Sequence, residues 1–227
     1  MLREQIHLSP LTRIQTMTTN NFKTTTVVTG TFAAIAGVSH AAEAAAADEL
    51  IAKIKSQDDN VRGPAWQGAG PCGAPAVRPL AAVMTDADFE IARSAKRALY
   101  KIVRHAGRPG AAKETKAVVA ELIALLSNSP AVVRRETLWM LSEIGGDEAV
   151  APMAALLSDK ELREDARCAL VRLPGKKATA ALKSAFAGAP EEFKFALAES
   201  LRQRGEKVKG YPSQKLVPTR QTTVAQQ

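Results

Sequence analysis

The stretch AVRPLAAVM at residues 76–84 decides the fold, because a closely similar stretch returns later in the chain. Residues 149–157 read AVAPMAALL, so the valine, the proline, the paired alanines and the apolar positions coincide. The same apolar pattern, without the proline, occurs at residues 118–126 and at residues 178–186. Self-similarity of this kind is typical of repeat architectures, in which each unit is one supersecondary element.

A second pattern precedes these stretches and consists of an apolar residue with a basic residue beside it or two positions on. Its apolar positions are spaced 30, 42, 29 and 31 residues apart. These positions are Val61, Ile91, Val133, Leu162 and Phe193. Stretches with glycine or proline separate the two patterns within four of the units, as turns do. We therefore predict about five units, each made of two helices.

Composition and periodicity both indicate helices. Apolar residues are 46% of the chain but aromatic residues only 4%. Alanine, which is abundant here, is the best helix former, whereas strands favour β-branched and aromatic residues. Val133, Leu138, Leu141 and Ile144 recur at helical spacing on one stripe. Because each amphipathic pair needs a neighbour to cover its apolar side, stacked pairs build one continuous core. The predicted class is all-α.

Residues 57–205 resemble the HEAT-repeat family in its short bacterial form. The resemblance rests on Val-Arg at residues 61–62 and 133–134, on the turn glycines, and on the Ala-Val-x-Pro opening of the two quoted stretches. It implies a right-handed α-solenoid of about five helix pairs. It further implies that the second helices line a concave surface that binds protein partners.

The same resemblance implies structural ion pairs between neighbouring repeats, for which Asp59 with Arg62 and Asp159 with Arg163 are the candidates. These residues are not expected to form a functional site. Similar repeats occur in bilin lyases, so a lyase-like accessory function is one alternative, which an absorbance spectrum of the purified protein would test.

Three segments depart from the repeat pattern. Glycines and prolines from Gly63 to Pro75 predict that the first helix of the first unit is broken or frayed, since proline costs a helix interior about 3 kcal/mol. The long middle of the second unit, residues 104–115, predicts an exposed loop. Residues 42–56 predict an N-terminal capping helix. Residues 206–227 are polar, with two prolines, and predict an extended C-terminal tail.

In the capping helix, Leu50, Ile51 and Ile54 are expected to face inward. Glu49 and Lys53, four residues apart, are expected to form an ion pair on it.

Residues 1–41 have the pattern of a start region followed by a secretory signal peptide. Met17 is the favoured start, and Lys23 then precedes an apolar run at residues 27–38 that is too short to span a bilayer. Small residues around Ala41 suit a signal peptidase. We therefore expect a periplasmic or secreted bacterial protein, exported by the general secretion route, with no later transmembrane segment. An uncleaved N-terminal anchor is the alternative.

The sequence offers little chemistry. His105 is the only histidine after the presequence, and it is interpreted as a solvated loop residue. Cys72 and Cys168 fall in different repeats, too far apart to pair, and are interpreted as small buried residues. Trp66 and Trp139 are interpreted as core, and an open first repeat would make Trp66 the more exposed of the two. No phosphate loop, nucleophile motif or metal-ligand spacing occurs. We expect no catalysis, no cofactor and no metal.

One charged stripe is a candidate binding site. Between residues 93 and 116 there are eight basic residues and one acidic residue. Those that recur every three or four residues, and so share one side of a helix, are Arg93, Arg97, Lys101, Arg104 and Arg108. The alternative is an ordinary solvated helix face. Nucleic acid is not expected, because an exported chain does not meet it and no aromatic residues interleave with these charges to stack bases.

Three functions remain open from the sequence. The first is an exported protein-interaction or assembly scaffold without catalytic activity. The second is an envelope protein that binds an anionic polymer through the basic stripe, and the third is the lyase-like accessory protein. The formal net charge of +8 favours acidic partners in general and selects none of them.

Overall fold

The computed structural model describes residues 28–213, apart from the side chains of residues 28–40 and 128. The described part of the chain divides into two units, one that ends at Ser39 and one that begins at His40 and carries the repeats. The favoured start at Met17, most of the signal peptide and residues 214–227 of the tail lie outside the described residues. Within the described range all regular structure is helical, so the all-α expectation is confirmed. None of the described helices is sufficiently long and apolar to cross a membrane.

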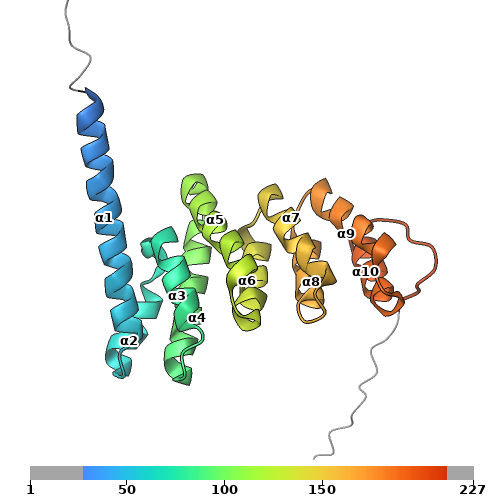
Figure 1. Ribbon diagram of the computed structural model, residues 1–227, viewed down its shortest axis with the longest axis horizontal. Coiled ribbons are helices and arrows are strands. Elements are labelled where there is room, and N and C mark those ends of the chain that lie inside the picture. Colours follow the sequence, from blue (N-terminus) through green and yellow to red (C-terminus); the bar gives the residue numbers. More distant parts are fainter. Residues whose placement is uncertain (1–27, 214–227) are drawn as a thin grey trace, which may run out of the picture. The chain divides into compact units, whose positions relative to one another are not determined.

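The unit that begins at His40 contains a row of helical hairpins (Figure 1). Their first helices are α2 (Asp59–Gln67), α4 (Phe89–Ala106), α6 (Ala131–Ile144) and α8 (Arg163–Arg172). Their second helices are α3 (Val77–Val83), α5 (Ala112–Asn128), α7 (Asp147–Ala155) and α9 (Lys176–Gly188). Short 3-10 turns follow α2 (Gly70–Cys72 and Ala74–Ala76) and α7 (Leu156–Ser158). One more helix, α10 (Glu191–Gln203), follows α9 and belongs to the layer of first helices.

Each helix packs on the equivalent helix of the next hairpin, and each second helix packs on the first helix that follows it in the chain. Helices α4 and α8 also pack on their own hairpin partners, α5 and α9. Successive first helices form one layer, and successive second helices form another. The result is an α-solenoid of four complete helix pairs, with α10 as the first helix of a fifth. The core runs continuously between the two layers.

The five apolar positions of the second sequence pattern occupy corresponding places. Ile91, Val133 and Phe193 are each the third residue of their helix, and Leu162 immediately precedes α8. All four are buried. Val61 is also a third residue, but its side chain is 40% exposed. The alignment of repeats is therefore confirmed, while the first repeat presents a different side of its helix to the core.

Arg62 takes the buried place in the first repeat and is only 5% exposed. Its guanidinium donates a hydrogen bond of 2.6 Å to the Ser56 carbonyl and pairs with Asp59 in the same helix. Two partners satisfy the buried cation, which would otherwise be costly to bury. The pair of Asp59 and Arg62 is thus local to α2 and does not link neighbouring repeats.

The prediction of a broken first helix is wrong. Helix α2 is continuous through Pro64, and the Asp58 carboxylate caps its N-terminus by accepting a 2.8 Å bond from the Asn60 amide. Proline removes only one backbone bond, and the cap and the Arg62 contacts compensate for that loss. The helix ends at Gly68, and the glycine- and proline-rich stretch forms the two 3-10 turns instead.

The prediction of a loop at residues 104–115 is also wrong. Helix α4 continues to Ala106 and α5 begins at Ala112, so the connection contains only residues 107–111. Thr115 ties the two helices together, because its hydroxyl donates a 2.7 Å bond to the Ala106 carbonyl. The spacing of 42 residues arises from long helices, 18 residues in α4 and 17 in α5.

The inward-facing residues predicted for the N-terminal capping segment do pack on the core, although the helix that contains them begins earlier than residue 42. They belong to α1 (Val28–Ile54), in which Leu50 and Ile54 are buried and Ile51 packs partly buried against the core. Lys53 and Glu49 form the expected ion pair at 2.7 Å.

The described part of the tail, residues 206–213, is not helical, as predicted, but it lies against α9 and α10. Tyr211 packs edge-on against Phe186 of α9 and Phe195 of α10, with ring centroids 5.3 and 5.2 Å apart. The Arg202 side chain donates a bond of 3.0 Å to the Tyr211 carbonyl. The segment therefore packs on the last two described helices of the stack.

Ion pairs connect successive first helices, as the family resemblance implied. Arg134 of α6 lies 3.5 Å from Asp159, which precedes α8. Arg163 of α8 lies 3.5 Å from Glu192 of α10. Asp159 and Arg163 are thus both in the ladder, each with a partner from the adjacent repeat instead of with one another.

Candidate functional site

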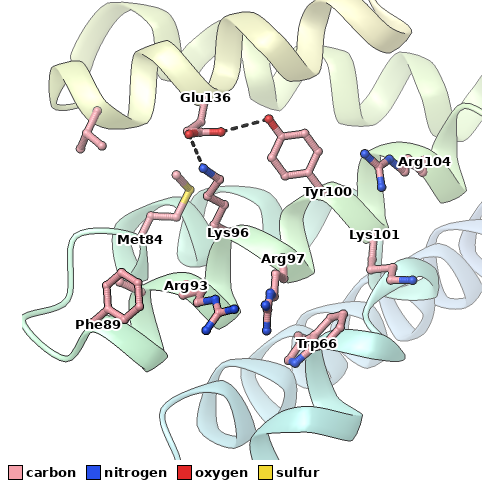
Figure 2. Close-up of a pocket in the computed structure, with 12 residues that line it drawn as sticks. Trp66, Met84, Phe89, Arg93, Lys96, Arg97, Tyr100, Lys101, Arg104 and Glu136 are labelled. Atoms are coloured by element: carbon pink, nitrogen blue, oxygen red, sulfur yellow. Dashed lines mark hydrogen bonds and ion pairs between the residues drawn. The ribbon is translucent and has the colours of Figure 1, made fainter. Parts of the chain in front are cut away.

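A groove of about 630 Å³ lies on the layer of first helices, across α2, α4 and α6 (Figure 2). The second helices, expected from the family resemblance to form the binding surface, do not line it. Its walls combine aromatic, aliphatic and basic side chains. They are Trp66, Met84, Phe89, Ala92, Arg93, Lys96, Arg97, Tyr100, Lys101, Arg104, Val132 and Glu136.

Four of the five predicted stripe residues line this groove: Arg93, Arg97, Lys101 and Arg104. They share it because α4 is one continuous helix across all four positions. Arg108 does not belong to the stripe, because α4 ends at Ala106 and the chain turns away. Its guanidinium makes two hydrogen bonds of 2.7 and 2.6 Å to the Glu114 carboxylate. The expectation that Arg108 shares the side of the helix with the other four residues is therefore wrong.

The sequence reasoning missed the apolar part of the groove. Phe89, at the start of α4, is 71% exposed, and Val132, at the start of α6, is 49% exposed. Met84, Trp66 and Tyr100 extend the apolar lining. Tyr100 had a detectable signal, since it lies four residues after Lys96 and four before Arg104 on one helix face. The claim that no aromatic residues interleave with the charges is wrong.

The one carboxylate that lines the groove is already engaged. Glu136 of α6 accepts a 2.5 Å bond from the Lys96 ammonium and a 3.0 Å bond from the Tyr100 hydroxyl, both from α4 (Figure 2). Burial, followed by the charge of Glu136, raises the pKa of Tyr100 above its ordinary value. The phenol therefore stays protonated and continues to donate to Glu136 at neutral pH.

Two cations in the centre of the groove keep an uncompensated charge. Among the described residues, neither Arg97 nor Lys101 has an ion-pair partner. Both lie over the Trp66 ring, with the Arg97 guanidinium carbon 5.0 Å and the Lys101 ammonium 6.0 Å from its centroid (Figure 2). By contrast, Arg93 pairs with Glu90 at 3.1 Å and Arg104 lies 3.6 Å from Glu143. The ring holds the two free cations at a fixed place.

The two tryptophans differ in exposure, and because α2 is intact, Trp66 is not the more exposed one. Trp66 is partly buried and packs on the core, whereas Trp139 of α6 is 40% exposed. Trp139 therefore does not fill the core, and the Arg172 guanidinium of α8 covers its ring at 5.1 Å.

A second hollow, of about 890 Å³, contains His105 and Cys72 on the side of α3 and α5. His105 is in the last turn of α4, not in a loop, and its Nε2 lies 3.8 Å from the Glu114 carboxylate. Burial raises the pKa of the Cys72 thiol, which disfavours the nucleophilic thiolate. Both cysteines are unpaired and half-buried. Across the described part of the chain, no group of three acidic, histidine or cysteine residues is placed to hold a metal.

Comparisons with known proteins add little to this geometry. No family model and no curated protein matches the chain. Among solved structures, the chain is similar to a designed armadillo repeat protein in complex with the peptide (KR)4. That likeness has 19% identity and a TM-score of 0.40, over 68% of this chain and 80% of that one. An engineered protein matches with 22% identity and a TM-score of 0.36, over 69% and 78% of the two chains. Because both scores are low, the α-solenoid fold rests on the helices described above.

Proposed function

We propose that this chain is an interaction scaffold whose groove binds an acidic segment of a partner protein. One observation carries the proposal: the uncompensated charges of Arg97 and Lys101 line the same groove as the exposed apolar side chains of Phe89 and Val132. A partner that supplies a carboxylate to the cations and an apolar side chain to Phe89 is complementary to both halves of the groove.

A protein segment fits this lining better than a polyanion does. A uniformly charged polymer would pair with the cations and leave Phe89, Met84 and Val132 in water. Covering an aromatic side chain that is 71% exposed gives a peptide an additional apolar contribution. The polyanion is therefore the competing outcome of the test, and it predicts binding that depends on charge alone.

The test is a calorimetric titration of the purified chain with two peptides of equal charge, one of glutamates only and one in which leucines alternate with glutamates. We expect the leucine-containing peptide to bind more tightly. Changing Arg97, Lys101 and Arg104 together to Gln should weaken its binding at least about tenfold, which corresponds to about 1.4 kcal/mol.

The matched control removes the same charge elsewhere. Lys55, Lys176 and Lys207 are exposed, lie outside the groove and have no ion-pair partner among the described residues. Their joint change to Gln should alter the affinity by less than about twofold at moderate salt, since exposed distant charges are screened. Equal losses in both triple variants would show non-specific attraction and refute a built site. Equal affinity for the two peptides would favour the polyanion.

We further propose that the protein is exported and acts without catalysis in the periplasm or outside the cell. The presequence pattern supports export, and burial is compatible with cleavage after Ala41. Residues 41–46 are all exposed, and the first buried side chain of α1 is Ala47, so cleavage removes no core contact that the structure describes. The intact mass of the protein from its native envelope should correspond to a chain that begins at Ala42. A mass that retains residues 17–41 would contradict export with cleavage.

A further inference from the structure

The contact between Trp66 and Arg97 has a counterpart two hairpins further along the stack. In the first, a tryptophan of α2 lies under an arginine of α4, with the guanidinium carbon 5.0 Å from the ring centroid. In the second, Trp139 of α6 lies under Arg172 of α8 at 5.1 Å. In both, a first helix supplies the ring and the next first helix supplies the cation. The layer of first helices thus contains two tryptophan–arginine pairs of the same construction.

The second pair has the properties that make the first a binding element. The Trp139 side chain is 40% exposed. Arg172 is exposed, and within the described range its only recorded interaction is with that ring. An aromatic surface and an uncompensated cation are therefore available together, as they are at Trp66 and Arg97.

Helix α6 joins the two places. Val132 and Glu136, which line the groove, precede Trp139 by seven and three residues. Residues three, four and seven apart share one side of a helix, so Trp139 stands between the residues of α6 that line the groove and Arg135, which precedes it by four residues. The opposite neighbour, α8, is held by Arg135, whose side chain donates a 2.9 Å bond to Asp165. A segment leaving the groove along this side of α6 meets Trp139 next.

We propose that the partner segment continues from the groove to Trp139 and Arg172, so that it carries two acidic clusters. This inference rests on the proposed function and specifies the length of the partner. Helices in contact lie about 8–10 Å apart, so α2 and α6 are separated by about 16–20 Å. An extended chain covers about 3.3 Å per residue, and five or six residues therefore separate the two clusters.

Tryptophan fluorescence can follow binding at the two places separately, because the chain has only two tryptophans and one lies at each place. In Trp139→Phe, fluorescence comes from Trp66 alone, and in Trp66→Phe it comes from Trp139 alone. The probes are two peptides. The short one has about four residues and a single cluster of glutamate and leucine, and the long one has about twelve residues and two such clusters. Both lengths follow from the estimated span.

The longer peptide should change the emission of both single-tryptophan variants. In the unmodified chain it should bind at least about tenfold more tightly than the short one, because the second cluster binds at a high effective concentration. Arg172→Gln should reduce this difference in affinity to less than about threefold. Lys176 is an exposed cation on the next helix with no ion-pair partner among the described residues, so Lys176→Gln should preserve the difference.

Two results would overturn the inference. If the longer peptide changes the emission of Trp66 but not of Trp139, the segment ends in the groove, and the proposed function stands without the extension. If the Arg172→Gln variant still binds the longer peptide at least about tenfold more tightly than the short one, Arg172 covers the Trp139 ring and does not bind the partner. Absence of any binding, in fluorescence and in calorimetry alike, would refute the proposed function as well.

Discussion

At the scale of single residues, the sequence predicts positions well and the direction of side chains less well. Val61 aligns with Val133 in the repeat pattern and occupies the same place in its helix, yet only Val133 is buried. The difference comes from Arg62, whose bond to the Ser56 carbonyl depends on a turn outside the repeat pattern. The same limit applies to the groove. Arg97 was predictable from helical spacing, whereas its contact with Trp66 joins residues of different hairpins.

The two valines provide a direct comparison. Val133→Ala should lower the free energy of unfolding by about 2 kcal/mol, because it removes buried methyl groups. Val61→Ala, the same change at the equivalent helical position, should cost less than about 0.5 kcal/mol, because that side chain is 40% exposed. Urea denaturation of both variants measures the difference. Equal losses would show that the first repeat is packed like the third.

Arg62 should stabilise the fold mainly through the Ser56 carbonyl. Arg62→Met fills a similar volume but leaves that acceptor without its donor, and should cost about 1–3 kcal/mol. Asp59→Asn removes only the exposed partner of the ion pair and should cost less than about 1 kcal/mol. The comparison is made by thermal denaturation. A larger loss from Asp59→Asn would assign the stabilisation to the ion pair instead.

At the scale of elements, the helices were predictable and their lengths were not. The spacing of 42 residues admits either a long loop or long helices, and only the tertiary contact of Thr115 with the Ala106 carbonyl decides between them. Likewise, proline predicted a break in α2, but the helix start at Asp58 and the Arg62 contacts outweigh one missing bond. The place of residues 206–213 was not predictable from periodicity, because it depends on individual contacts of Tyr211 with Phe186 and Phe195.

The tail segment should be released by acid. Hydrogen bonds from the Tyr211 hydroxyl and from Lys194 lower the pKa of Glu191, and a hydrogen bond from Ser213, followed by one from Arg202, lowers that of Glu199. A carboxylate whose pKa is lower in the folded state stabilises that state above its unfolded pKa, and the contribution disappears as the pH falls through the folded pKa. The protection of residues 206–213 against hydrogen exchange, measured relative to the intrinsic exchange rate at each pH, should therefore fall below the ordinary carboxylate value of 4.5.

Tyr211→Phe provides the control for this pH dependence. It keeps the ring contacts with Phe186 and Phe195 but removes the hydroxyl that Glu191 accepts from. The acid-dependent change in exchange should become smaller in this variant, while exchange at neutral pH changes little. An unchanged acid response would mean that Glu191 does not anchor the segment.

At the scale of the whole molecule, the repeat pattern predicted an all-α solenoid and the order of its helices. It did not predict which layer bears the candidate site. The family resemblance favoured the second helices, whereas the groove lies on the first helices. Its lining comes from three hairpins, so no pattern within one repeat contains it. Sequence periodicity reports what each helix buries, and it says little about which exposed side chains of different helices gather at one place.

Hydrogen exchange measured with and without the two-cluster peptide tests the central claim most directly. If the peptide binds in the groove and along α6, amides of α4 and α6 should exchange more slowly in its presence. Those of α3, α5 and α7 should be unchanged. Protection confined to the second helices would place the binding surface on the opposite layer and contradict the account.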